Sequence, residues 1–249
     1  MVTLKSKAEL ETMRAAGRIV FGVLDELKRH VRPGISTWDL DKVAEEYIRG
    51  HGATPSFKGL YGFPATICAS ISEEIVHGIP SKKRVLADGN VFTADVGAML
   101  DGLHADSAYT YAVGEISPEA RRLLQVTEES LYAGIKEARA GNHVGDIGHA
   151  VQTVAEAAGF GVVRELVGHG IGRTFHEEPQ VPNYGRPKRG PLLKVGMTIA
   201  IEPMITAGDP ATRTLDDKWT VVTMDGSLSA HFEHTVAITE NGPVILTTA

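Results

Sequence analysis

Residues 91–112 read VFTADVGAMLDGLHADSAYTYA, and this stretch does most to decide the fold. Apolar, β-prone residues on both sides of Asp101-Gly102 predict two antiparallel strands joined by a two-residue turn. In that register Asp95 and Asp106 share one face of the hairpin as diagonal neighbours, close enough to hold common metal ions. They lie opposite Ala108 and Gly97, which leave space beside them. A turn one residue longer would place the two aspartates on opposite faces.

Two later apolar segments also carry a carboxylate, Glu202 in TIAIE (198–202) and Glu233 in AHFEHTVAI (230–238). Asp and Glu are depleted from strands and are rarely buried without a partner. Any one of the four could be a surface residue on an edge strand, but that interpretation does not suit all four together. Four buried, unpaired carboxylates would be very unfavourable, and no Lys or Arg stands in these segments. The sequence therefore predicts bound metal ions.

Working outward, helical periodicity and capping residues predict two pairs of helices, each pair followed by strands: residues 6–30, 36–52, 117–140 and 144–158. Arg32-x-Gly34 recurs as Arg139-x-Gly141, 107 positions later, and the same shift relates Asp95 to Glu202. This repeat predicts an α+β fold with two pseudo-symmetric halves, about 1–116 and 117–249. No segment is typical of a flexible linker, so we expect one domain.

Composition limits the class of protein. The chain has 249 residues, a net charge of −6 and a pI near 5.9, which gives no electrostatic basis for binding nucleic acid. A single cysteine, Cys68, excludes internal disulfides and indicates a reducing compartment. No apolar stretch approaches the roughly 18 residues of a membrane span, and no signal-peptide pattern begins the chain. We expect a cytoplasmic protein whose surface is compatible with a monomer.

Three histidines stand in settings suited to a metal or catalytic site: His77 in VHGIP, His169 among three glycines and His176 in FHEEP. A lone histidine is more often a structural residue, and His104, His231 and His234 stay open because they adjoin the acidic segments. Four carboxylates balance two divalent ions, and mixed oxygen and nitrogen ligands favour Mn, Fe, Co or Zn. Two such ions can activate a water and polarise a carbonyl, which predicts hydrolysis.

At this point the residues resemble the methionine aminopeptidases. The match rests on five motifs and covers essentially the whole chain: VHGIP (76–80), GHGIG (168–172), FHEEP (175–179), IEPM (201–204) and FEHT (232–235). The resemblance implies the pita-bread fold. Only 26 residues separate His176 from Glu202, which leaves no room for the helical insertion of type II enzymes. The chain is therefore similar to short, bacterial-type type I enzymes.

The resemblance also implies roles for individual residues. The metal ligands would be Asp95, Asp106, His169, Glu202 and Glu233. Glu202 would also carry a proton from the metal-activated water, while His77 and His176 would contact the substrate amide and stabilise the tetrahedral intermediate. The methionine side chain would lie in a substrate pocket formed by Phe63, Cys68, Phe175 and Trp219, with Phe57, Leu60 and Tyr61 at its rim.

The implied function is removal of the initiator methionine from nascent proteins, near the ribosome, when the second residue is small. Two alternatives on this fold are an X-Pro peptidase, which usually carries a large N-terminal domain, and creatinase-like chemistry, which does not require an intact metal set. A different class is a peptide-binding module that has lost catalysis. Such a module would be expected to have replaced metal ligands, whereas all five stand in this sequence.

Overall fold

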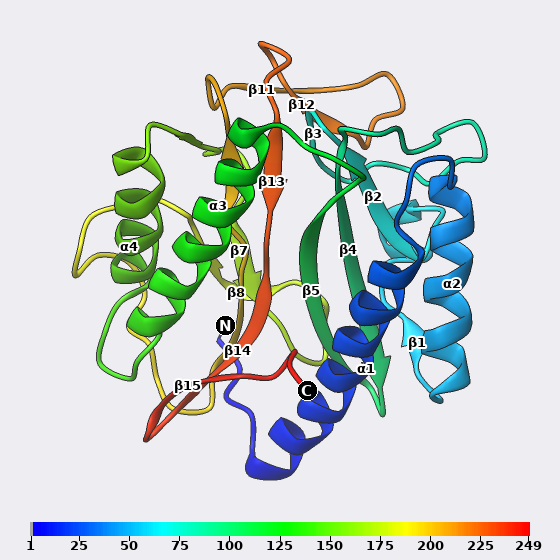
Figure 1. Ribbon diagram of the computed structural model, residues 1–249. Helices are drawn as coiled ribbons and strands as arrows, with labels where there is room; N and C mark the ends of the chain where they lie inside the picture. Colours follow the sequence, from blue (N-terminus) through cyan, green and yellow to red (C-terminus); the bar gives the residue numbers. More distant parts are fainter. Residues whose placement is uncertain (1) are drawn as a thin grey trace.

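The computed structural model describes residues 2–249, and in this range two pairs of helices flank the central strands (Figure 1). The helices are α1 (Lys7–His30), α2 (Thr37–Gly50), α3 (Pro118–Glu137) and α4 (Val144–Ala157). Ser6 and Glu9 form a capping box at the start of α1, and the Ser117 side chain caps α3. The predicted helices are therefore confirmed. None of the described helices is long and apolar enough to cross a membrane.

The predicted hairpin is formed by β4 (Val91–Leu100) and β5 (Leu103–Ala112). Asp101 and Gly102 both have positive φ, as the favoured two-residue turn requires. Asp95 pairs with Ala108 and Asp106 with Gly97, so the expected register is confirmed. The other edge of β4 pairs with β1 (Thr54–Pro55) and β2 (Ile67–Ile71). Helices α1 and α2 pack on one face of this sheet and bury its core, which leaves the other face for the site.

The second half contains a five-stranded sheet that packs against α3 and α4. Its order is β15 (Gly242–Ile245), β14 (His234–Thr239), β9 (Thr198–Ile201), β7 (Gly168–Gly170) and β8 (Glu177–Val181). Shorter strands form two further sheets: β13 (Ser229–His231), β10 (Met204–Thr206) and β6 (Gly161–Val162), then β11 (Thr212–Thr214), β12 (Val221–Thr223) and β3 (Glu74–Val76). A short 3-10 turn, η1 (Leu60–Gly62), precedes β2.

The 107-residue repeat is visible in backbone detail. Helices α2 and α4 have the same length and begin at Thr37 and Val144, which are related by that shift. Gly34 and Gly141 have φ of 91° and 92°, and each donates its N–H to a leucine carbonyl at the matching position of its own half. The left-handed backbone explains why glycine occupies both turns. The fold is α+β with two pseudo-symmetric halves, as predicted.

The two halves join where β5 lies beside β14. The Glu233 N–H donates to the Ala108 carbonyl at 3.0 Å, and the Asp106 N–H donates to the Thr235 hydroxyl at 3.0 Å. One expectation is corrected here, because Glu202 and Glu233 lie between strands rather than inside them. β9 ends before Pro203, which has no N–H for the ladder, and the chain passes from one sheet to another at both glutamates. Both carboxylates consequently lie near the junction.

Candidate active site

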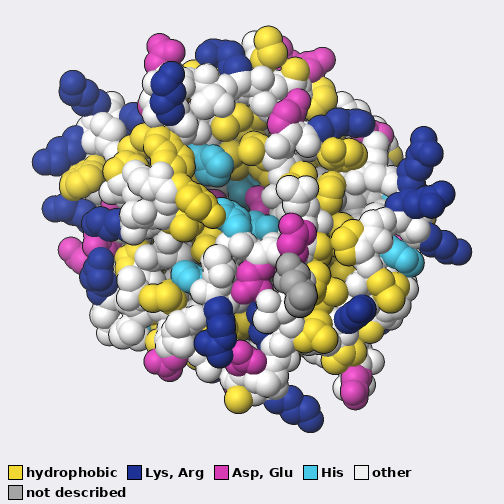
Figure 2. All heavy atoms as spheres, turned by 180° about the vertical axis from the view of Figure 1, so that it is seen from behind, with side chains coloured by type: hydrophobic (Ala, Val, Ile, Leu, Met, Phe, Trp, Pro, Cys, Tyr) yellow, Lys and Arg dark blue, Asp and Glu magenta, His cyan; other side chains and the backbone are white. Residues whose placement is uncertain are grey.

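A cavity of about 240 Å³ opens at the junction of the two halves. Figure 2 shows histidine and acidic side chains in a hollow at the centre of this face, with apolar side chains around it. Every site residue predicted from the sequence lines this one cavity: Phe63, Cys68, His77, Asp95, Asp106, His169, Phe175, His176, Glu202, Trp219 and Glu233. The expected rim residues Phe57, Leu60 and Tyr61 line it as well.

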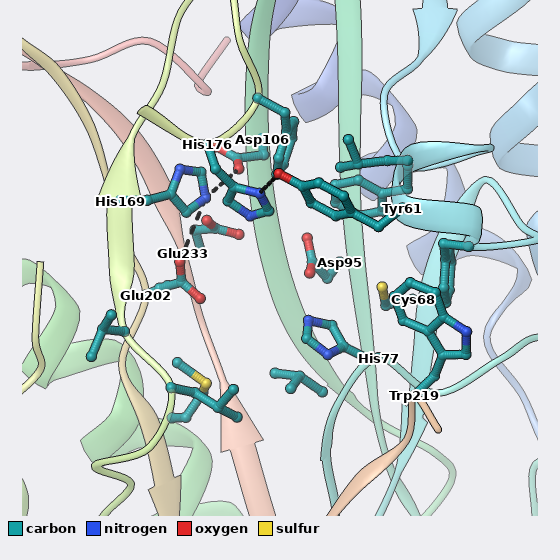
Figure 3. Close-up of a pocket in the computed structure, with 18 residues that line it drawn as sticks. Tyr61, Cys68, His77, Asp95, Asp106, His169, His176, Glu202, Trp219 and Glu233 are labelled. Carbon is teal, nitrogen blue, oxygen red and sulfur yellow. Dashed lines mark hydrogen bonds and ion pairs between the residues drawn. The ribbon is translucent and has the colours of Figure 1, made fainter. Parts of the chain in front are cut away.

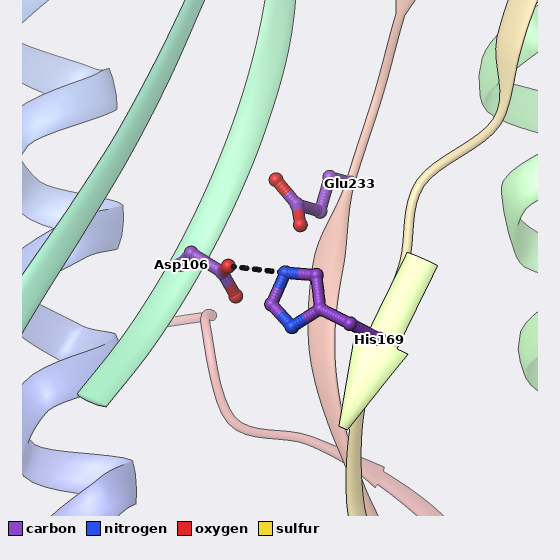
Figure 4. Close-up of side chains that lie close together, drawn as sticks. All are labelled: Asp106, His169 and Glu233. Atoms are coloured by element: carbon purple, nitrogen blue, oxygen red, sulfur yellow. Dashed lines mark ion pairs between the residues drawn. The ribbon is translucent and has the colours of Figure 1, made fainter. Parts of the chain in front are cut away.

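Three of these residues form the tightest group of possible metal ligands. Asp106 from β5, His169 from β7 and Glu233 before β14 each offer one ligand atom, and these atoms all lie within 4.8 Å of one another (Figure 4). The His169 Nε2 is 3.4 Å from Asp106 Oδ2 and 3.8 Å from Glu202 Oε1. His169 Nδ1 donates to the Gly170 carbonyl at 2.8 Å, which leaves Nε2 facing the carboxylates.

The carboxylates of the cavity lack cationic side chains. Among the described residues, no Lys or Arg lies within ion-pair distance of Asp95, Asp106, Glu202 or Glu233. Asp95 Oδ1 is buried and has no hydrogen-bond partner among the described residues. Burial, with the nearby Asp106 charge, raises the pKa of Asp95 well above its usual range. Burial likewise raises the pKa of Glu202 to about 8 and that of Glu233 well above normal.

These observations fit a bound divalent metal. Buried carboxylates that no Lys or Arg neutralises, together with the His169 imidazole, are a donor set that Mn, Fe, Co or Zn accepts. Burial alone would lower the pKa of His169, but Asp106 and Glu202 outweigh it and raise this pKa to about 9. The cavity thus attracts positive charge, whether from protons or from metal ions. Asp95 and Glu202 lie outside the tightest group but line the same cavity.

Two further histidines lie beside the carboxylates, and Figure 3 shows both pointing into the pocket. The His176 ring packs edge-on against His169 with centroids 4.4 Å apart. Desolvation by the pocket wall, with the His169 charge, lowers the pKa of His176 to about 4. His77 lies in the left-handed region at φ 61°, a conformation that is rare outside glycine, and packs near Trp219. Burial lowers the pKa of His77 too, so both rings are neutral N–H donors.

One wall of the cavity is apolar. Phe63 packs edge-on against Trp219 with ring centroids 5.1 Å apart, and Phe175 does the same with Phe57 at 5.2 Å. Cys68 is 5% exposed, and burial together with the Asp95 charge raises the pKa of its thiol well above normal. The thiol is therefore uncharged and acts as an apolar group. This wall suits an uncharged, flexible side chain next to the carboxylates.

Several contributing residues were not predicted from the sequence. Val76, Leu166, Val167 and Met204 also line the cavity. Each lies in, or within two residues of, a motif that was recognised, and this adjacency is the signal that could have identified them. Thr235 holds Asp106, since its hydroxyl lies 2.7 Å from Asp106 Oδ1.

The structure gives different surroundings to the three histidines whose roles the sequence did not decide. His104 Nδ1 contacts the Ser56 hydroxyl and His234 Nδ1 the Thr247 hydroxyl, both at 2.9 Å, and neither residue lines the cavity. His231 is buried 3.8 Å from Glu202 Oε2, and its ring nitrogens have no hydrogen-bond partner among the described residues. His231 thus lies behind Glu202 rather than in the cavity.

Comparison with known proteins identifies the family. The profile of metallopeptidase family M24 matches residues 11–240, which include every residue of the cavity. The chain belongs to metallopeptidase family M24. Membership of this family implies the use of divalent metal, in agreement with the cluster of Asp106, His169 and Glu233.

Individual proteins of family M24 can be compared with this chain directly. Methionine aminopeptidase 1 of Bacillus subtilis is 56% identical over 247 residues, covering 99% of both chains. The crystal structure of methionine aminopeptidase from Thermotoga maritima superimposes with a TM-score of 0.99 at 44% identity, covering 100% of both chains. Prolidase from Pyrococcus furiosus shares the fold alone, with a TM-score of 0.77 and 21% identity over 99% of this chain and 65% of that one. The predicted family resemblance and pita-bread fold are confirmed.

Proposed function

We propose that this M24 peptidase is a methionine aminopeptidase, which hydrolyses the peptide bond after an N-terminal methionine when the second residue is small. The observation that carries the proposal is the single cavity in which an apolar wall meets the carboxylate–histidine cluster. Its similarity to methionine aminopeptidase 1 of Bacillus subtilis over nearly the whole of both chains supports the same activity. An X-Pro peptidase is supported by the fold alone.

In this proposal Asp95, Asp106, His169, Glu202 and Glu233 hold two divalent ions, drawn from Mn, Fe, Co or Zn. Bound there, the ions would lower the pKa of water and polarise the scissile carbonyl. The buried, mutually close carboxylates and the orphaned Asp95 Oδ1 support this ligand set. Thr235 orients one of the ligands through its hydrogen bond to Asp106.

The remaining steps belong to side chains of the protein. Glu202, which lines the cavity, would carry a proton from the attacking water to the leaving amine. His77 and His176 are neutral and would donate N–H groups to the carbonyl oxygen as negative charge develops on it. Phe63, Cys68, Phe175 and Trp219 would hold the methionine side chain.

The preference for a small second residue would follow from the crowding around the scissile bond. His77 and His176 both point into the cavity beside the carboxylates, and the exposed Tyr61 stacks on His176 at the rim (Figure 3). A branched second side chain would have to displace one of these rings. An alanine or serine would leave all three in place.

We further propose that the chain forms one catalytic domain, with internal halves at about 1–116 and 117–249. The substrates would be the N-termini of nascent polypeptides in the cytoplasm, met near the ribosome by a monomeric enzyme. The net charge of −6 supports the absence of a nucleic-acid partner.

The proposal is tested by methionine release from Met-Ala-Ser and Met-Leu-Ser, using metal-stripped protein with and without added Mn or Co. An Ala-Pro-Ser peptide tests the X-Pro alternative in the same assay. We expect cleavage of Met-Ala-Ser alone, and only with metal. Cleavage of Ala-Pro-Ser alone would favour an X-Pro peptidase. No cleavage by folded, metal-loaded protein would favour a binding module.

A further inference from the structure

Tyr61 has an unusual conformation at the rim of the cavity. It is 73% exposed, and its backbone lies in the left-handed region at φ 50° and ψ 19°. A bulky residue is rare in this region and persists there when its surroundings fix it. Here the turn is closed by two hydrogen bonds, from the Gly59 N–H to the Phe63 carbonyl at 2.8 Å and from the Phe63 N–H to the Leu60 carbonyl at 2.9 Å. The turn therefore aims Tyr61 at a defined place.

That place is the outer face of His176. The two rings are nearly parallel, with an interplanar angle of 10° and centroids 5.8 Å apart, and the Tyr61 hydroxyl lies 3.4 Å from His176 Nδ1 (Figure 3). The hydroxyl contacts only Nδ1, so the other ring nitrogen, Nε2, points away from Tyr61 and into the cavity. Hydrogen bonds of this kind are often long in a free enzyme and tighten when substrate binds.

The direction of this hydrogen bond decides the tautomer of His176. A neutral imidazole has one N–H and one acceptor nitrogen, so a proton on one nitrogen leaves the other as an acceptor. A phenol is a much stronger acid than a neutral imidazole N–H, so the Tyr61 O–H donates and Nδ1 accepts.

We propose that Tyr61 is a positioning residue, which holds His176 in the Nε2–H tautomer so that this N–H can donate to the substrate carbonyl oxygen. The inference rests on the proposed function for its catalytic consequence, while the tautomer itself is a property of the free protein. In the other tautomer Nε2 would present a lone pair to the developing negative charge and would oppose the reaction.

The tautomer is tested by two-dimensional ¹H–¹⁵N NMR of the histidine rings in Zn-loaded, diamagnetic protein, with the His176 signals assigned from their loss in His176→Asn. We expect the Nε2–H form in the wild type. In Tyr61→Phe, which keeps the stacked ring and loses the hydroxyl, we expect a mixture of both forms. Tyr132→Phe removes a tyrosine hydroxyl outside the cavity and should leave the His176 signals unchanged.

The catalytic consequence is tested by a double-mutant cycle on methionine release from Met-Ala-Ser. Tyr61→Phe should lower kcat roughly 3- to 10-fold with little change in KM, as expected for the loss of one hydrogen bond. In the His176→Asn background the same substitution should have no further effect, because the two residues act as a unit.

An unchanged His176 tautomer in Tyr61→Phe, or an equal kcat loss with and without His176, would overturn the inference. Failure of the proposed function gives a different pattern. In that case the wild type would release no methionine, and the NMR comparison would still decide whether Tyr61 sets the tautomer.

Discussion

Thr235 provides a sharp test of how the metal ligands are held. It is fully buried in β14, and its hydroxyl lies 2.7 Å from Asp106 Oδ1. The same hydroxyl accepts the Asp106 backbone N–H at 3.0 Å. Thr235→Val replaces this hydroxyl with a methyl group of nearly the same shape. The substitution therefore removes both interactions without creating a large cavity.

The expected cost follows from these two interactions. Losing a hydrogen bond to a charged acceptor costs about 1.5–3 kcal/mol, and leaving a buried N–H without a partner costs about 1–3 kcal/mol. Together the free energy of unfolding should fall by about 2.5–6 kcal/mol. Because such a residue orients a ligand, metal affinity should fall roughly 10- to 100-fold.

The assay compares Thr235→Val with Thr235→Ser, which keeps the hydroxyl and serves as the matched control. Urea unfolding of the metal-free proteins gives stability, and calorimetric titration with Mn gives affinity. The Ser variant should bind Mn nearly as tightly as the wild type. If the Val variant also binds like the wild type and is equally stable, Thr235 does not hold Asp106 and the reasoning is refuted.

Three further predictions concern the same cavity. Glu233→Ala should lower metal content and activity together, and unchanged stoichiometry by elemental analysis would remove Glu233 from the ligand set. His176→Ala should lower kcat by roughly 10²-fold or more with metal content intact; loss of metal would instead make His176 a ligand. The metal-free protein should lose stability as the pH rises from about 6.5 to about 9. The pKa values of Glu202 (about 8) and His169 (about 9) are raised above their unfolded values. In this range the folded state therefore holds protons that the unfolded state has released. Urea unfolding should show a loss of about 1.4 kcal/mol per pH unit for each extra proton, whereas a gain would contradict the raised pKa values.

Local rules explain what could be predicted from the sequence. Asp101-Gly102 specifies a two-residue turn, and the strand period of two then fixes the shared face of Asp95 and Asp106. The helix ends follow from caps such as Ser6, whose hydrogen bonds involve only the next three residues. The repeat was detectable because turns such as Gly34 need a left-handed residue.

Long-range contacts explain which features could not be predicted from the sequence. Thr235 contacts Asp106 across 129 positions, and a threonine in a strand is too common to indicate such a role. Tyr61 meets His176 across 115 positions through a turn whose direction no periodicity encodes. The placement of Glu202 between strands depends on which sheet each neighbouring strand joins, and that choice is made by tertiary packing.

The central claim is that one cavity holds two divalent ions among five side chains. Anomalous diffraction from crystals of the Mn-loaded protein tests it most directly. The account predicts two Mn peaks between Asp95, Asp106, His169, Glu202 and Glu233, with the apolar wall of Phe63 and Trp219 beside them. Metal bound elsewhere, or no metal in the cavity of an active, Mn-loaded enzyme, would contradict it.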